Sequence, residues 1–191
     1  TSNAPETKDN DFTWKDFQAR NNNELVAIFG NFINRVVVLT NKYYNGIVPQ
    51  PNELSEVDKA TLTELKAYPA VISSSIERYR FREALGELMN VARLGNKYLA
   101  DEEPWKMIKT DEARTQTQMY VALQIAGALS VLCEPFLPFT ATKLTRILKS
   151  AGLLNWNSVS ETSDLIPVGH QIGEAELLFS KIEDEEIQKQ I

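Results

Sequence analysis

Residues 22–44 constrain the fold of this chain more than any other stretch, because their apolar side chains recur at steps of three and four. That spacing gathers them into one stripe along a helix, and such a stripe has to pack against other elements. We expect the helix to begin near Thr13, with room for a break at the three asparagines 21–23, and to end at Asn45-Gly46. The stripe consists of Leu25, Ile28, Phe29, Phe32, Val36, Leu39 and Tyr43.

Four later segments show the same helical period and carry recognisable boundaries. Ser55 and Asp111 precede two of them and can accept hydrogen bonds from the first exposed amides. Pro69 is expected to break or bend the earlier of these two helices. Residues 111–132 are apolar almost all round, which predicts a central helix. The remaining boundaries are expected at Pro104, Pro135, Pro138 and Ala151-Gly152.

About five helices with short connectors and little strand signal predict an all-α fold, an antiparallel helical bundle. We expect an irregular entry segment at 1–12, the bundle at 13–152, and an extended C-terminal segment with a short helix at 153–191. At 191 residues, 43% hydrophobic and 24% charged, the chain suits one folded core.

Composition excludes several kinds of site. Cys133 is the only cysteine and His170 the only histidine, so neither an internal disulfide nor a cysteine- or histidine-based metal cluster is expected. No apolar run has the length of a membrane span. The net charge of −6 opposes a broad phosphate-binding surface, so a contact with nucleic acid would be local.

Asn31, Arg35 and Trp105 are the candidate binding residues. Asn31 and Arg35 are four apart and therefore neighbours on one helix face, where an amide beside a forked cation suits the polar edge of a nucleobase. The same pair is also typical of a solvated face or a link to another helix. Trp105 follows a proline in a polar segment, so it is either a stacking platform for a base or packed under the bundle rim. Asn96 and Lys97 would border the same site.

Four stretches, in order and in spacing, resemble the anticodon-binding domain of methionyl-tRNA synthetase, and the resemblance covers nearly the whole chain. They are Phe12-Thr13-Trp14-Lys15-Asp16-Phe17 with Asn22-Asn23-Glu24-Leu25 and Gly30-Asn31-Phe32-Ile33-Asn34-Arg35; Asn96-Lys97-Tyr98-Leu99 with Pro104-Trp105; Leu132-Cys133-Glu134-Pro135-Phe136-Leu137-Pro138-Phe139; and Gly169-His170-Gln171-Ile172 with Leu178-Phe179-Ser180-Lys181-Ile182-Glu183.

The resemblance implies a class Ia synthetase bundle that binds methionine-specific tRNA through its CAU anticodon. Asn31, Arg35 and Trp105 match the family positions that contact the anticodon, with Trp105 stacking on the first base. The implied parent ligates methionine to its tRNA with ATP, with zinc as a candidate second cofactor, in the cytoplasm and without a membrane. The catalytic domain of the parent chain is the second implied partner.

The chain begins without a methionine and lacks the two ATP-site signatures of that family, so we expect a piece of a longer protein. Such a piece would hold no catalytic residue, metal or cofactor of its own and would be inactive alone. Two alternatives stay open. One is the equivalent domain of the isoleucine, leucine, valine or cysteine synthetase. The other is a helical protein–protein interaction module that binds its partner through Trp105. The net charge of −6 is compatible with this alternative.

Overall fold

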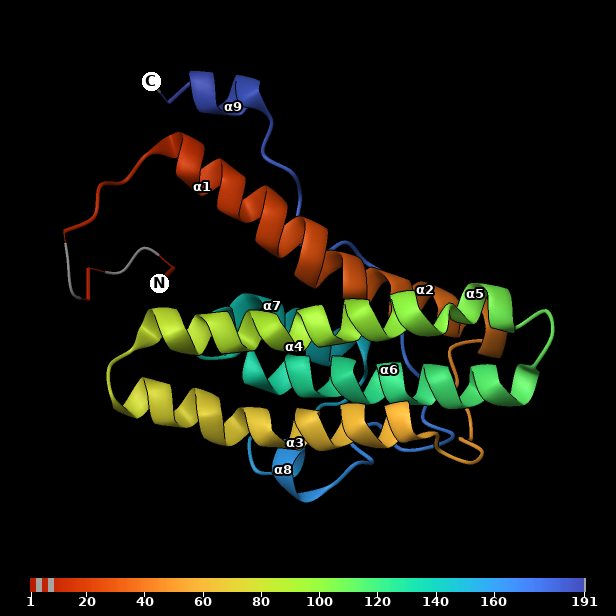
Figure 1. Ribbon diagram of the computed structural model, residues 1–191. Coiled ribbons are helices and arrows are strands. Elements are labelled where there is room, and N and C mark those ends of the chain that lie inside the picture. The colour runs from red at the N-terminus through yellow and green to blue at the C-terminus, as the bar shows by residue number, and fades with distance from the viewer. Residues whose placement is uncertain (3–4, 7–8, 191) are drawn as a thin grey trace.

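The computed structural model describes residues 1–2, 5–6 and 9–190, and Figure 1 shows a bundle of helices. Within these residues the only β-type pairing is an isolated bridge between Ile47 and Gln171, which confirms the all-α expectation. In chain order the elements are α1 (Trp14–Arg20), the π-helical η1 (Asn21–Gly30), α2 (Asn31–Tyr44), α3 (Glu56–Glu77), α4 (Phe81–Glu102), α5 (Pro104–Met107), α6 (Glu112–Leu132), α7 (Pro138–Ile147), α8 (Ser158–Glu161) and α9 (Asp184–Gln188).

The expected helix starts are confirmed by their caps. The hydroxyl of Thr13 accepts from the amide of Asp16, and the carboxylate of Asp111 accepts from the amide of Arg114. Ser55 forms a complete capping box with Asp58. Each cap satisfies backbone amides that the first helical turn leaves without a partner.

The structure differs from the expected helix breaks and ends at three places. The chain does not break at the asparagines, because α1, η1 and α2 run on as one rod with helical backbone at both joints. Pro69 lies inside α3 and does not break it, while the bend that was the alternative expectation stays a prediction. The helix α7 ends at Ile147 rather than at 151–152, because Lys149 adopts a left-handed backbone with φ of 50°.

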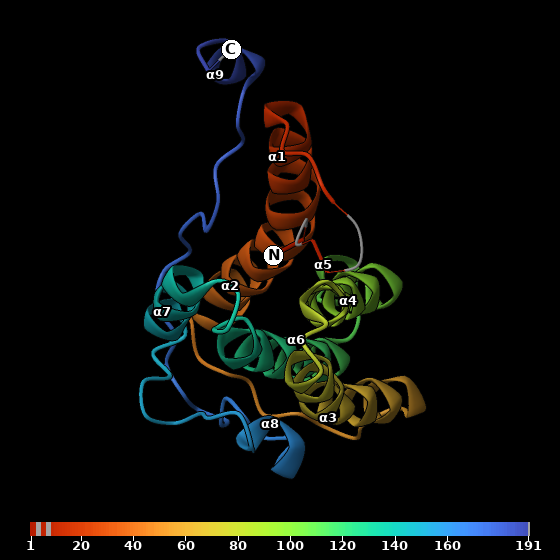
Figure 2. The ribbon, with the colours of Figure 1, turned by 90° about the vertical axis from the view of Figure 1, so that its left-hand side faces the viewer.

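The helices α3, α4 and α6 lie side by side, and the rod formed by α1, η1 and α2 lies across α4 and α6 (Figure 1). Seen along the bundle, α6 occupies the middle, with α2, α3, α4 and α7 around it (Figure 2). Residues 115 and 117–130 of α6 are all buried. This confirms residues 111–132 as the central helix.

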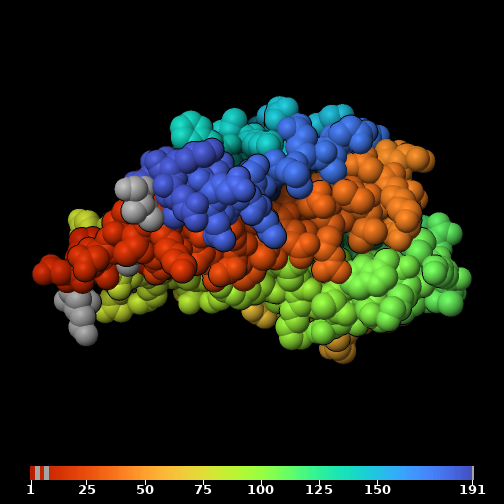
Figure 3. All heavy atoms as spheres, turned by 90° about the horizontal axis from the view of Figure 1, so that it is seen from above, coloured from red at the N-terminus to blue at the C-terminus, as the bar shows by residue number. Residues whose placement is uncertain are grey.

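The asparagines at the joint of α1 and η1 hold the C-terminal segment. The side-chain amide of Asn22 donates to the carbonyl of Ile182 and accepts from its N–H, both at 2.9 Å. Asn21 donates to the carbonyl of Ser180 at 2.9 Å. Figure 3 shows the C-terminal segment, in blue, lying over the rod, in red to orange. The asparagines that predicted a helix break therefore bind residues 180–182 of the C-terminal segment instead.

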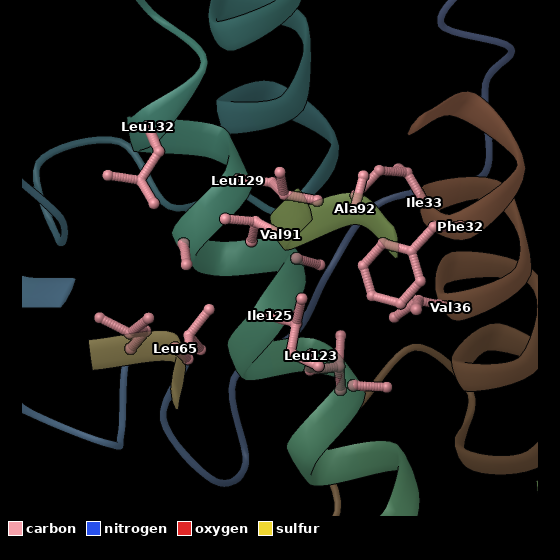
Figure 4. Packing of buried hydrophobic residues seen from close by; sticks show 14 of the residues in the cluster. Phe32, Ile33, Val36, Leu65, Val91, Ala92, Leu123, Ile125, Leu129 and Leu132 are labelled. Atoms are coloured by element: carbon pink, nitrogen blue, oxygen red, sulfur yellow. The ribbon is translucent and has the colours of Figure 1, made fainter. Parts of the chain in front are cut away.

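The buried face of the rod is wider than the predicted stripe. Phe29, Phe32 and Val36 are fully buried as expected, whereas Leu39 and Tyr43 are only half-buried. Ile33, Val37 and Thr40 are buried as well. Figure 4 shows Phe32, Ile33 and Val36 facing the apolar side chains of α6. The C-terminal segment also contacts the rod, because the ring of Phe179 lies edge-on to Phe29 and Asn41 donates to the carbonyl of Gly173.

Gly95 sets how closely α2 and α4 approach. A Cβ atom on Gly95 would lie 2.4 Å from Cε2 and 2.5 Å from Cζ of Phe32, closer than carbon atoms can pack. Phe32 is fully buried, so its ring has no room to withdraw. The crossing brings Asn96, the next residue on α4, against the rod where η1 meets α2.

A buried charge network ties the end of α4 to the starts of α3 and α6. Asp58 accepts from Tyr98 Oη at 2.6 Å and from Arg114 Nη1 at 2.5 Å. Arg114 also donates to Glu102. Burial alone raises the pKa of Asp58, but the hydrogen bonds from Arg114, Tyr98 and the Ser55 amide outweigh it and hold that pKa below the ordinary value. The network fixes the end of α4, from which α5 departs.

Gly95→Ala should destabilise the chain by about 1–3 kcal/mol, because the added methyl overpacks the contact with Phe32. Gly86→Ala is the matched control on the same helix, since nothing lies within 4 Å of the Cβ position there. That control should be neutral or stabilising by about 1 kcal/mol through helix propensity. Urea unfolding measures both, and equal stabilities would contradict the close crossing.

Asp58→Asn should cost about 3–5 kcal/mol at neutral pH, because it leaves Arg114 without its main partner. The folded pKa of Asp58 is lowered, so its stabilisation is complete above the unfolded pKa of about 3.9 and is lost as the pH falls through the folded pKa. Acidification from about pH 6 to about pH 3 should therefore destabilise wild type more than the variant. Parallel pH dependences in urea unfolding would rule out this role.

Candidate functional site

Four of the five predicted site residues come together where α2, α4 and α5 meet. Asn31 and Arg35 lie on the first turns of α2, Asn96 lies near the end of α4, and Trp105 lies on α5. Figure 1 places α5 beside α2 and the end of α4, at the end of the bundle away from both chain termini. The following contacts are therefore local to one edge of the molecule.

Asn31 and Asn96 bind each other across the crossing of α2 and α4. Nδ2 of Asn31 donates to Oδ1 of Asn96 at 3.1 Å. Nδ2 of Asn96 donates to the carbonyls of Ile28 at 2.9 Å and of Ala92 at 3.1 Å. Asn96 is half-buried, whereas Asn31 is exposed. Asn96 is thus anchored to the backbone. Asn31 is exposed, and its remaining polar groups face solvent.

Arg35 lies over the ring of Trp105, with its guanidinium carbon 4.5 Å from the ring centroid. At this distance the cation is attracted to the negative face of the indole. Trp105 is half-buried and packs against the hydrophobic core. The indole is therefore packed under the bundle rim and also contacts the guanidinium of Arg35. A stacking platform for a base stays a prediction.

The backbone around Trp105 is fixed from both sides. Glu103 adopts a left-handed conformation with φ of 44°, which is unfavourable for a residue that carries a side chain and precedes a proline. Its amide donates to the carbonyl of Leu99, and Pro104 is buried at the first position of α5. Gln118 of α6 donates to the carbonyl of Glu102 at 2.9 Å. These contacts set the direction in which Trp105 leaves the bundle.

Lys97, the fifth predicted residue, lies on another flank of α4. Its ammonium pairs with Asp101 at 2.5 Å, and hydrogen bonding to that carboxylate raises the pKa of Lys97. Lys97 follows Asn96 by one residue, so its side chain leaves α4 about 100° round the helix axis from that of Asn96. The structure therefore gathers Asn31, Arg35, Asn96 and Trp105 without it.

The four gathered residues form an open surface. A groove of about 610 Å³ lies between the rod and the first turns of α4, and none of the four lines it. Within the part of the chain that the structure describes, no three His, Cys, Asp or Glu side chains could hold a metal ion together. No described helix is long and apolar enough to span a membrane. An open edge with a π-face, a cation and an amide suits a planar polar group.

Comparison with known proteins identifies two family models along the chain. The model described as the anticodon binding domain of methionyl tRNA ligase matches residues 48–190. The model described as tRNA synthetases class I (M) matches residues 1–37. The boundary between the two matches lies within the rod and its following loop.

The methionine–tRNA ligases of three bacteria match the whole of this chain. Identity is 81% for Flavobacterium psychrophilum, 72% for Christiangramia forsetii and 56% for Cytophaga hutchinsonii. The chain spans 28%, 28% and 27% of the lengths of these relatives.

Solved structures of Mycobacterium tuberculosis methionyl-tRNA synthetase have the same fold. The free-state structure matches with a TM-score of 0.83 at 21% identity, over 90% of this chain and 35% of that one. A complex with methionyl-adenylate matches with a TM-score of 0.79 at 23% identity, over 88% of this chain and 33% of that one.

Arg35→Leu should expose Trp105 and destabilise the chain by about 0.5–1 kcal/mol, because the cation over the indole is lost. In a background carrying Trp14→Phe and Trp156→Phe, Trp105 is the only tryptophan, and its emission should shift to longer wavelength on this substitution. Arg93→Leu is the control, since Arg93 pairs with Glu24 and not with Trp105. An unchanged spectrum would contradict the contact between Arg35 and Trp105.

Proposed function

The chain belongs to the anticodon-binding domain family of methionyl-tRNA ligases, and on that premise we propose that it binds the CAU anticodon of methionine tRNA. The observation that carries the proposal is the contact of Arg35 with Trp105 beside Asn31. Unpaired bases are recognised by stacking on aromatic rings and by hydrogen bonds to their edges. Trp105 on α5 offers the aromatic ring, and Asn31 and Arg35, one turn apart on α2, offer the hydrogen-bonding groups.

In the proposed complex, the first anticodon base stacks on Trp105, and polar base edges meet Arg35 and Asn31. Arg35 supplies donors only, whereas the amide of Asn31 can donate and accept. A wrong base would leave these groups desolvated and unpaired, which costs about 1–3 kcal/mol for each. Recognition of a few splayed bases needs no extended basic surface, which is consistent with the net charge of −6.

The whole protein is proposed to be a cytoplasmic ligase that joins methionine to its tRNA with ATP. The relatives of which this chain spans about 28% are methionine–tRNA ligases, and the methionyl-adenylate in the M. tuberculosis complex supports ATP as co-substrate. The catalytic domain would lie in the rest of the parent, and this chain alone would be inactive. Zinc, the second cofactor that the resemblance implies, is assigned to that part as well.

Two other functions are less well supported. The match of residues 48–190 to the methionyl family favours methionine over the isoleucine, leucine, valine and cysteine siblings. A protein–protein interaction module would use the same edge around Trp105. It would bind without regard to the anticodon sequence, which separates it from the proposal.

Trp105→Ala should weaken binding of a CAU anticodon stem-loop by about 1–3 kcal/mol, or about five- to 150-fold, because one stacked base is lost. A stem-loop with its first base changed should also bind wild type more weakly. Fluorescence anisotropy of labelled stem-loops measures both effects. Trp156→Ala is the matched control, since Trp156 lies in the loop between α7 and α8.

Equal binding of both stem-loops, or binding that ignores Trp105, would contradict the proposed site and favour the interaction module. If the 191-residue chain binds neither loop, the same substitution is tested in the whole ligase. Aminoacylation of methionine tRNA by that ligase should then fall with Trp105→Ala and stay unchanged with Trp156→Ala.

A further inference from the structure

We propose that Asn96 fixes the orientation of the Asn31 side-chain amide, so that the site selects bases with an exocyclic amino group over bases with a keto oxygen at the same position. Asn96 is then a positioning residue that acts on the base through Asn31. This inference rests on the proposed function and adds the chemical rule by which the site discriminates.

The orientation of Asn96 is set by the backbone. A side-chain amide has two N–H donors on nitrogen and an acceptor oxygen. Both donors of Asn96 are used, one on the carbonyl of Ile28 and one on the carbonyl of Ala92, at 2.9 and 3.1 Å. Turning the amide over would place its oxygen against two carbonyl oxygens. Asn96 can therefore present only Oδ1 toward α2.

The orientation of Asn31 follows from that of Asn96. Oδ1 of Asn96 accepts from Nδ2 of Asn31 at 3.1 Å. A reversed Asn31 would bring two amide oxygens together and lose this hydrogen bond. Its own Oδ1 is consequently turned away from Asn96, and the residue is exposed. Asn31 thus presents its Oδ1 and its second N–H to an incoming base in one fixed order, with Oδ1 on the side away from Asn96. An unrestrained asparagine could present them in either order.

The resulting pattern distinguishes amino from keto bases. An acceptor on Asn31 one turn from the donor-only guanidinium of Arg35 is complementary to an amino group next to a ring-nitrogen acceptor. Cytosine and adenine carry that pair, whereas uracil and hypoxanthine place a keto oxygen where the amino group would be. The first two bases of the proposed CAU anticodon are cytosine and adenine. The keto oxygen would face Oδ1 of Asn31 and repel it.

The crossing of α2 and α4 makes this arrangement rigid. Gly95 lets α4 approach Phe32, and the approach brings Asn96 within hydrogen-bond distance of both Ile28 and Asn31. An ordinary link between two helices would need only one such bond. Here a chain of three hydrogen bonds runs from backbone carbonyls to an exposed amide beside the contact of Arg35 with Trp105.

The test compares three stem-loops on the 191-residue chain, with anticodons CAU, UAU and C-inosine-U. Wild type should prefer CAU over at least one keto loop by about tenfold, the effect of one lost hydrogen bond with an unpaired acceptor. Asn96→Leu should reduce that preference to about twofold or less, because Asn31 is free to turn its NH₂ outward. Binding of the keto loop should be unchanged or tighter.

Two further variants separate positioning from damage to the fold. Asn31→Leu removes the acceptor at an exposed position and should abolish the preference even if Asn96→Leu fails to fold. In Asn31→Asp with Asn96→Leu, both carboxylate oxygens accept, so the preference for amino bases should return. Asn90→Leu is the matched control, because the contacts of Asn90 stay within α4. Thermal unfolding of every variant is recorded alongside.

A preference that survives Asn96→Leu or Asn31→Leu would overturn the inference. A wild-type chain that binds CAU through Trp105 but treats keto loops equally would overturn it as well, while leaving the proposed function intact. Failure of the proposed function has a different signature, namely binding of CAU that is indifferent to Trp105→Ala or absent in both the chain and the whole ligase.

Discussion

The close crossing of α2 and α4 at Gly95 is the constraint on which the candidate site depends. Without a side chain at this position, the buried ring of Phe32 packs directly against the backbone of α4. The same contact that closes the core also brings Asn96 to Asn31, one residue beyond the glycine. The core packing thus sets the geometry of the proposed site, because Asn31 and Asn96 are within hydrogen-bond distance only when Phe32 lies close to Gly95.

A second anchor holds the other half of the site. The buried Asp58 and the half-buried Arg114 tie the last turn of α4 to the starts of α3 and α6. The helix α5 with Trp105 follows that turn directly. Arg35 then spans the two halves by lying over the indole. Side chains held by a rigid scaffold lose little conformational entropy when a base binds. The proposed site therefore needs few contacts to bind a base, even on a domain whose net charge is −6.

The sequence was most informative where signals are local. The period of the apolar residues in α2 and the caps at Thr13, Ser55 and Asp111 predicted the helices, and the resemblance singled out Asn31, Arg35 and Trp105. Long-range contacts could not be predicted. The asparagines 21–23 read as a break because their partners, residues 180–182, lie at the far end of the chain. Asn96 was predicted only as a border residue, although the mid-helix glycine before it was a signal of close approach.

The edge formed by α2, α4 and α5 is proposed to bind the anticodon. A ¹⁵N NMR titration of the chain with a CAU stem-loop locates the surface that the loop contacts. If this edge binds the loop, resonances should shift for the Trp105 indole N–H, the Asn31 side-chain NH₂ and the backbone amides at 31–35, 96, 103 and 105–107. Shifts confined to the opposite end of the bundle, around Tyr79, Phe81 and Phe139, would contradict it.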